Sequence, residues 1–221
     1  MANQRDWTSA DLEALSPSAQ PITQYKPAGD RTTYDRLYTH WDDSSARAHY
    51  RIAWRTQVPL TGERTLTPSI IPPGSAHVDG LYSAGSPRQH EDGLVLASGA
   101  LSSLLVDFYT RSRGFSHVRS SAANSLPTVS TASPLALRVR YRALRLNCLT
   151  DAYADLWTEC WDEAFLDDSP ILERYDDRLV SPEWTADTPL RRAEDRRNAQ
   201  AEIDVMVAMM LEVPIEDLCT I

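Results

Sequence analysis

The side chains of this sequence best suited to bind a ligand are basic and lie in two segments. Arg51 and Arg55 are four residues apart in a run where arginine alternates with aromatic or apolar residues, so on a regular strand they share one face. Arginine forks bind phosphate groups and guanine edges in bidentate fashion, which makes these residues candidate nucleic-acid contacts. The full set of candidates is Arg51, Arg55, Arg64, Arg111, Arg113, His117 and Arg119.

Structural roles compete with the binding role for these arginines. Arg51 and Arg55 are equally suited to a salt bridge or to stacking on Trp54. A second group, Arg138, Arg140, Arg142 and Arg145, is expected either to form a solvated helix face or to pair with acidic residues near the end of the chain. The abundance of arginine overall, 21 residues against one lysine, is most simply explained by a GC-rich coding sequence.

Motifs for catalysis are absent from this sequence. It contains no Gly-rich nucleotide loop, and its one Pro-Pro pair, Pro72-Pro73, lacks the preceding amide side chain with which adenine methyltransferases grip a flipped base. No His or Cys spacing is typical of zinc, and His90-Glu91-Asp92 and His77 with Asp79 are better explained as surface loop residues than as metal ligands. The only lysine, Lys26, has no acid beside it of the kind metal-dependent nucleases use. We therefore expect no catalytic or metal-binding residues in this chain.

Charge is distributed unevenly along the 221 residues, whose formal net charge is −9. Residues 41–142 carry a net charge of +4, whereas residues 143–221 carry −12. Phosphate attracts the first of these segments and repels the second. The distribution permits a nucleic-acid face on the middle segment and predicts that the acidic end faces protein or solvent.

The cysteines and the hydropathy pattern predict a cytoplasmic location for this protein. Three cysteines, Cys148, Cys160 and Cys219, are odd in number and far apart, which fits a reducing cytoplasm and not a disulfide framework. We expect Cys148 and Cys160, like Trp54 and Trp157, to be core residues. No apolar run is long enough for a membrane span, and the first residues have no signal-peptide core.

The periodicity predicts an α+β fold with a small antiparallel sheet in the first half and a predominantly helical second half. Strands are expected at 50–55, 64–71 and 78–82, with Pro68 at an edge or bulge. A short helical piece is expected within 30–41, a helix of about four turns over 93–109, and a loop over 115–133. Helical patterns also cover 135–165, with a break near Asn147 or Thr150, and 188–211, followed by a last turn at 215–219. We predict two parts, an α+β part at residues 1–133 that would contact DNA and a helical, acidic part at residues 134–221. The alternative is that the two parts form one continuous domain.

Three groups of residues carry a resemblance to a known family. The first is Tyr50-Arg51-Ile52-Ala53-Trp54-Arg55 followed by Arg64-Thr65-Leu66 and Ile70-Ile71-Pro72-Pro73-Gly74. The second is Leu144 to Thr150 with Tyr153 to Trp157, and the third is Glu202-Ile203-Asp204 leading to Glu216 to Ile221. In their order and spacing these motifs resemble the C-terminal target-recognition region of large adenine-specific DNA methyltransferases of type II restriction–modification and phage-defence systems.

This resemblance implies a fragment of a larger enzyme that recognises its site on double-stranded DNA. It implies that S-adenosylmethionine is bound by a methyltransferase catalytic domain elsewhere in the same parent chain, and that this chain alone holds no cofactor. The alternative is a helical protein-interaction module that docks on that catalytic domain or on a partner subunit. A stand-alone hydrolase or nuclease is a third hypothesis, which the missing motifs disfavour.

Overall fold

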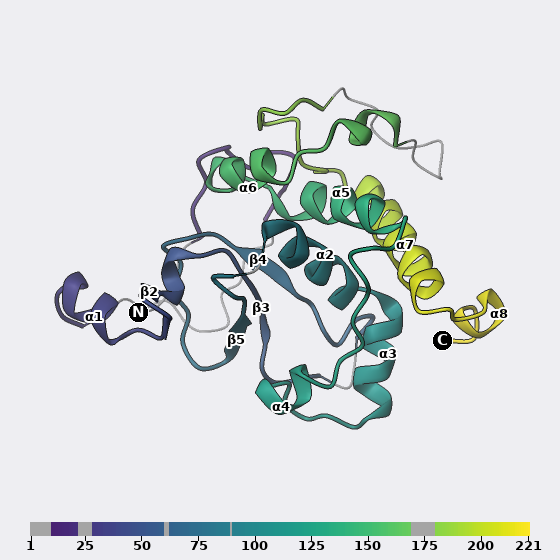
Figure 1. The fold of residues 1–221 in the computed structure, drawn as a ribbon, viewed down its shortest axis with the longest axis horizontal. Coiled ribbons are helices and arrows are strands. Elements are labelled where there is room, and N and C mark those ends of the chain that lie inside the picture. Colours follow the sequence, from purple (N-terminus) through teal and green to yellow (C-terminus); the bar gives the residue numbers. More distant parts are fainter. Residues whose placement is uncertain (1–9, 22–27, 60–61, 89, 169–179) are drawn as a thin grey trace.

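The computed structural model describes residues 10–21, 28–59, 62–88, 90–168 and 180–221. Two small antiparallel sheets lie in the first half of the chain and helices dominate the second, so the predicted α+β class is confirmed. In Figure 1, helices α2 and α5 lie beside the larger sheet, and α7 packs against both of them. The smaller sheet and α1 form one end of the molecule.

The larger sheet has the strand order β4-β3-β5, with β3 (Arg51–Arg55) between β4 (Ser69–Ile71) and β5 (Leu81–Ala84). Both pairings are antiparallel, and Ile52 lies opposite Ile70 on one side and Ala84 on the other. The predicted hairpin of the first two strands is thus confirmed. The third strand begins three residues later than predicted.

The second strand is shorter than predicted and begins at Ser69, not at Arg64. Pro68 has no N–H to donate to a neighbouring strand. The N–H groups of Thr65 and Leu66 are bound instead by one carboxylate oxygen of Asp107, at 2.6 and 2.7 Å. The prediction that Arg64 lies at the start of the facing strand was therefore wrong.

The end of the molecule that contains the smaller sheet is built from short elements. Helix α1 (Arg31–Leu37) begins at Asp30, whose side chain accepts a hydrogen bond of 2.8 Å from the N–H of Thr33. It is followed by the two-residue strands β1 (His40–Trp41) and β2 (Ser44–Ser45) and by a 3₁₀ turn at Ala46–Ala48. A helical piece within 30–41 was predicted, and α1 confirms it.

The helix predicted over 93–109 is in fact two helices, α2 (Glu91–Leu101) and α3 (Leu104–Ser112), which meet at 63°. Two serines end the first helix and begin the second. The hydroxyl of Ser102 donates to the carbonyl of Gly99, and that of Ser103 donates to Ala100 while it caps the N–H of Val106. The hydrophobic period continues across this break, which is why it predicted one helix. The expected loop 115–133 also contains a single helical turn, α4 (Ser120–Ala123).

The second half is helical, as predicted, and is interrupted where expected. Helix α5 (Ala136–Asn147) ends at Cys148, and α6 (Ala154–Glu159) follows a 3₁₀ turn at Asp151–Tyr153. A further 3₁₀ segment covers Glu163–Asp167. Helix α7 (Ala193–Met210) is the longest, and α8 (Ile215–Leu218) forms the predicted last turn after Pro214.

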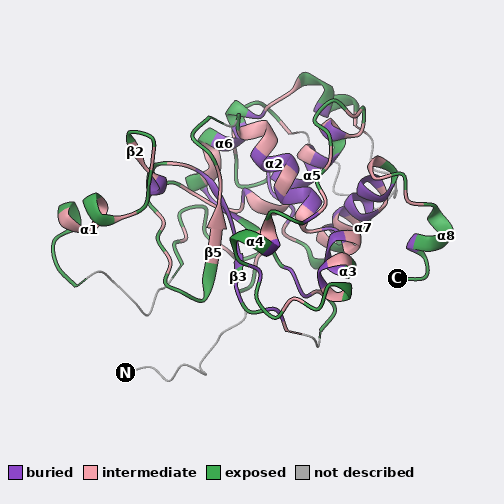
Figure 2. Ribbon diagram, turned by 60° about the horizontal axis from the view of Figure 1, so that its bottom comes forward, coloured by how far each residue is buried: buried purple, intermediate pink, exposed green. Residues whose placement is uncertain are grey.

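The hydrophobic core extends across both halves of the chain. The larger cluster of buried side chains includes Trp54 and Ile70 from the sheet together with Trp157 and Phe165 from the second half. A smaller cluster, with Val139 and Ile203, fills the space between α2, α5 and α7. Figure 2 shows the buried residues concentrated on β3 and on the facing sides of these three helices. Residues on both sides of position 133 therefore pack into one interior.

Among the described residues, no single helix combines the length and the apolar composition needed to cross a bilayer. The pair α2 and α3 meets that criterion only when both are counted together across their bend.

The three cysteines differ sharply in exposure. Cys148 and Cys160 are buried, as predicted, and burial raises the pKa of both thiols. Cys219 is exposed. We predict that a thiol reagent such as Ellman's reagent labels one thiol of the native protein quickly and the other two only on unfolding, because the thiolate is the reactive form. The variant Cys219→Ser is the control and should lose the fast phase; fast labelling that survives in it would contradict the buried positions.

Candidate nucleic-acid interface

A pairing of two distant segments brings several of the candidate basic residues together. The N–H of Val58 donates to the carbonyl of Ser116 at 3.1 Å, and the N–H of Val118 donates to the carbonyl of Thr56 at 2.8 Å. Between these bonds Gln57 lies opposite His117 as an antiparallel bridge. The segment that follows α3 is thus joined to the end of β3.

This junction is anchored to the core through Trp54. The indole N–H of Trp54 donates to the carbonyl of Val118 at 2.9 Å, and both residues are buried. Trp54 is therefore a core residue, as predicted, and its ring is not free to stack on a base. It holds the backbone on which the neighbouring exposed residues, Arg55 and Arg119, are displayed.

Four of the seven candidates are exposed, and we call them the basic edge: Arg55, Arg113, His117 and Arg119. The side chain of Arg55 makes no hydrogen bond or ion pair with the part of the chain that the structure describes. The guanidinium of Arg113 lies 6.0 Å from the ring centre of Tyr109. A ring nitrogen of His117 lies 3.3 Å from the hydroxyl of Ser116. These contacts leave most of the donors of the basic edge facing solvent.

Arg119 has an acidic partner, but the pair is weak. Its guanidinium lies 2.9 Å from a carboxylate oxygen of Asp79, and the two side chains are 52% and 78% exposed. Ion pairs as exposed as this one contribute about 0–1 kcal/mol to the stability of a protein. A phosphate group can therefore displace Asp79 from Arg119 at little cost.

Arg51 shares its strand with Arg55 but is only 1% exposed. It donates hydrogen bonds to the carbonyl of Ser75 at 2.6 Å and to the hydroxyl of Tyr38 at 3.1 Å. Arg51 therefore has a structural role, but through a carbonyl, hydroxyls and the ring of Tyr38 and not through the expected salt bridge or stacking on Trp54. Arg51 ties the segment around Ser75 and helix α1 to the sheet, and it is closed to a ligand in this structure.

Arg64 and Arg111 also make internal ion pairs. Arg64 binds both carboxylate oxygens of Asp204, at 2.6 and 3.3 Å, and so joins the loop before β4 to α7. Arg111 lies 2.8 Å from Asp107 and donates to the carbonyls of Gly62 and Glu63 at 2.9 and 3.0 Å. Both arginines hold loops against helices, and neither belongs to the basic edge.

The second arginine group pairs largely with acids, one of the two outcomes expected for it. Arg142 is buried and lies between Asp168 and Glu202, and Arg138 binds the same Asp168 at 3.3 Å. We call these four residues the Arg142 network. Outside the network, Arg140 lies 2.8 Å from Asp92, and Arg145 donates to the carbonyl of Thr188.

Asp107 and Asp204, two acids to which the sequence analysis assigned no ion pair, join segments that are far apart in the chain. Asp107 bridges the loop before β4 to α3, and Asp204 binds Arg64 and the N–H of Leu104 at 2.7 Å. The spacing of Asp107 and Arg111, four residues apart on a helix, was a usable sign of one of these pairs.

Metal ligands are not assembled in the part of the chain that the structure describes: no three His, Cys, Asp or Glu residues lie close enough to hold an ion. Asp92 is engaged by Arg140, Asp79 lies against Arg119, and the Nε2 atom of His77 lies 2.8 Å from the hydroxyl of Ser83.

Comparisons with protein-family models, with curated protein sequences and with solved structures find no match to this chain.

Proposed function

We propose that this chain is a DNA-recognition module that contacts a duplex through the basic edge. The observation that supports it most directly is the backbone pairing of residues 56–58 with 116–118, which places Arg55, His117 and Arg119 on one exposed border of the sheet. Rigid backbone positions are what base and phosphate recognition requires.

The internal ion pairs support the same proposal. Three acids of the second half, Asp168, Glu202 and Asp204, are paired with arginines inside the fold. These three carboxylates are thus held away from the basic edge by their own arginine partners, while the arginines of the basic edge keep free donors.

The parent protein that we propose is the one the sequence motifs resemble, an adenine-specific DNA methyltransferase of a restriction–modification or phage-defence system. In that setting a catalytic domain of the same chain binds S-adenosylmethionine and carries out the transfer. This module selects the site, and the enzyme works in the cytoplasm.

Docking on a catalytic domain is the second candidate function. The end of the chain supports it, because Met209, Ile215 and Ile221 are exposed apolar residues on or next to α7 and α8. Acidic Glu216 and Asp217 lie beside them on α8. Such a surface favours a protein partner over a phosphate backbone.

Salt-dependent binding to a duplex of 20–30 base pairs tests the DNA proposal. We expect fluorescence anisotropy to show binding that weakens steeply between 50 and 200 mM salt. The slope of log K against log salt is negative. In the double variant Arg55→Gln/Arg119→Gln its magnitude should decrease by about 2, since each phosphate contact contributes about 0.9. The affinity at low salt should fall roughly tenfold or more.

Arg36→Gln is the matched control, because Arg36 is an exposed arginine on α1, which lies apart from α4 and the basic edge (Figure 1). Its slope and affinity should equal those of the unaltered protein. Absence of DNA affinity even at low salt would overturn the DNA proposal and favour the docking function. An equal loss in the control would refute the basic edge as the contact surface.

A further inference from the structure

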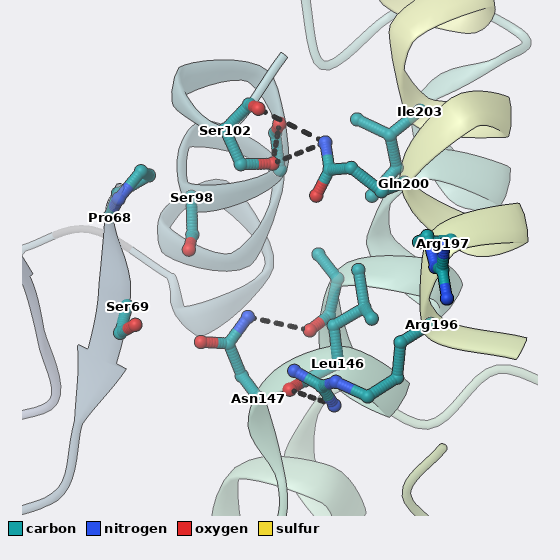
Figure 3. A pocket seen from close by; sticks show the side chains of 12 residues that line it. Pro68, Ser69, Ser98, Ser102, Leu146, Asn147, Arg196, Arg197, Gln200 and Ile203 are labelled. Carbon is teal, nitrogen blue, oxygen red and sulfur yellow. Dashed lines mark hydrogen bonds between the residues drawn. The ribbon is translucent and has the colours of Figure 1, made fainter. Parts of the chain in front are cut away.

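A polar cavity lies away from the basic edge, between β4, α2, α5 and α7. Its volume is about 260 Å³, and it is partly open to solvent. Figure 3 shows Ser69 and Ser98 on one side of it and Arg196, Arg197 and Gln200 of α7 on the other. No acidic side chain lines it. The proposed DNA contact makes no use of this site.

Arg196 is a largely buried cation without a counter-charge. Its Nη1 atom donates to the carbonyls of Leu146 and Leu190, at 3.1 and 2.9 Å, which leaves Nε and Nη2 uncommitted. It forms no ion pair within the described residues, and burial lowers the pKa of its guanidinium. Of the two buried arginines of α5, Arg142 is held by two carboxylates and Arg145 donates to the carbonyl of Thr188. A buried cation is costly unless an anion compensates it.

Arg197 adds a second positive charge to the cavity. It is exposed and lines the cavity, and its side chain makes no hydrogen bond or ion pair with the described part of the chain. Asp204, about two helical turns further along α7, is already bound by Arg64 and by the N–H of Leu104. Both guanidinium groups are therefore available to a ligand.

Two hydroxyl groups complete the set of donors. Ser98 is only 2% exposed and lines the cavity, and its hydroxyl makes no hydrogen bond among the described residues. Ser69, at the start of β4, is likewise without a partner there. Asn147 is not available, because its amide binds the N–H of Ile70 and the carbonyl of Ala143. The Ser98 hydroxyl borders the open space of the cavity, where an oxygen of a ligand can accept its hydrogen bond.

We propose that this cavity binds a phosphate group, held by Arg197, the free edge of Arg196 and the hydroxyls of Ser98 and Ser69. Donors that approach from two sides suit a tetrahedral oxyanion better than a planar carboxylate, which one guanidinium already satisfies. The phosphate belongs either to a small phosphate ester or to the backbone of DNA. The cavity is larger than a phosphate ion. It therefore also has room for part of the group that carries the phosphate, such as the sugar of a nucleotide.

Titration of the whole chain with inorganic phosphate, at constant ionic strength, tests the proposal. We expect saturable binding with a Kd in the millimolar range, seen as a rise in Tm and as broadening of the ³¹P NMR signal. Arg197→Gln and Ser98→Ala should each weaken it about tenfold. Both substitutions leave the hydrogen bonds of Arg196 to Leu146 and Leu190 intact, so the fold should persist.

Arg192→Gln is the control, because Arg192 is an exposed arginine directly before α7 that does not line the cavity. Its phosphate affinity should be unchanged. No saturable binding, or an equal loss in Arg192→Gln, would overturn the proposal.

A second titration, with duplex DNA, identifies the source of the phosphate. If Arg197→Gln also weakens DNA binding, the group is a DNA backbone phosphate; if only phosphate binding falls, it is a small phosphate ester. The double variant Arg55→Gln/Arg119→Gln separates this site from the basic edge, because it should lose DNA affinity and keep phosphate affinity. Failure of one proposal therefore leaves the other intact.

Discussion

Replacing Arg142 by alanine should lower the free energy of unfolding by about 3–5 kcal/mol, the cost of leaving buried charges without their partner. The Arg142 side chain is 3% exposed and lies between Asp168 and Glu202, which are buried to a similar degree. Without Arg142, Glu202 loses the cation that the structure places against it, and Asp168 keeps only Arg138. Urea denaturation followed by tryptophan fluorescence measures the change, since Trp157 lies in the core.

Arg138→Ala is the matched control for this prediction. It removes an arginine from the same helix and from the same acid, Asp168, but the Arg138 side chain is 45% exposed. We expect a loss of about 1 kcal/mol or less. If both variants lose the same stability, burial is not what makes the Arg142 network important.

Replacing Asp107 by alanine should cost about 3 kcal/mol or more, because it leaves two buried N–H groups without an acceptor. One oxygen of Asp107 accepts from Thr65 and Leu66, and the other lies 2.8 Å from Arg111. The loop before β4 then keeps only the hydrogen bonds of Arg111 to Gly62 and Glu63 as its attachment to α3. Hydrogen exchange at the amides of Thr65 and Leu66 should accelerate, in addition to the fall in the midpoint of unfolding.

Two further variants define the cause of this loss. Asp107→Asn keeps a carbonyl oxygen for the two N–H groups and removes the charge, so it should lose less stability than Asp107→Ala. Asp79→Ala removes an exposed acid that also pairs with arginine, and its stability should change by about 0.5 kcal/mol at most. Unaltered exchange at Thr65 and Leu66 in Asp107→Ala would contradict the role assigned to this carboxylate.

Local patterns predicted much of the fold and only part of the candidate site. The seven candidate residues were chosen by type and spacing, and the structure distributes them between two roles. Arg55, Arg113, His117 and Arg119 are exposed, whereas Arg51 is buried and Arg64 and Arg111 make internal ion pairs. The alternation around β3 correctly placed Arg51 and Arg55 on one strand, but it carries no information about what covers each of them.

The sequence by itself determined the features that depend on neighbouring residues. Alternation placed Trp54 toward the core in β3, the polar residues Asn147 and Thr150 marked the break after α5, and Pro214 preceded the last helical turn. The burial of Cys148 and Trp157 also followed from a helical, apolar pattern. In each case the physical cause, a side-chain period or a missing N–H, lies within a few residues.

Only the tertiary structure decided which charges remain free. Arg64 is neutralised by Asp204, 140 positions away, and Arg142 by Glu202, 60 positions away. The cavity beside Arg196 likewise exists only because β4, α2, α5 and α7 meet there. Ion pairing and cavity formation depend on which distant side chains share a small volume, and that is set by packing of the whole chain.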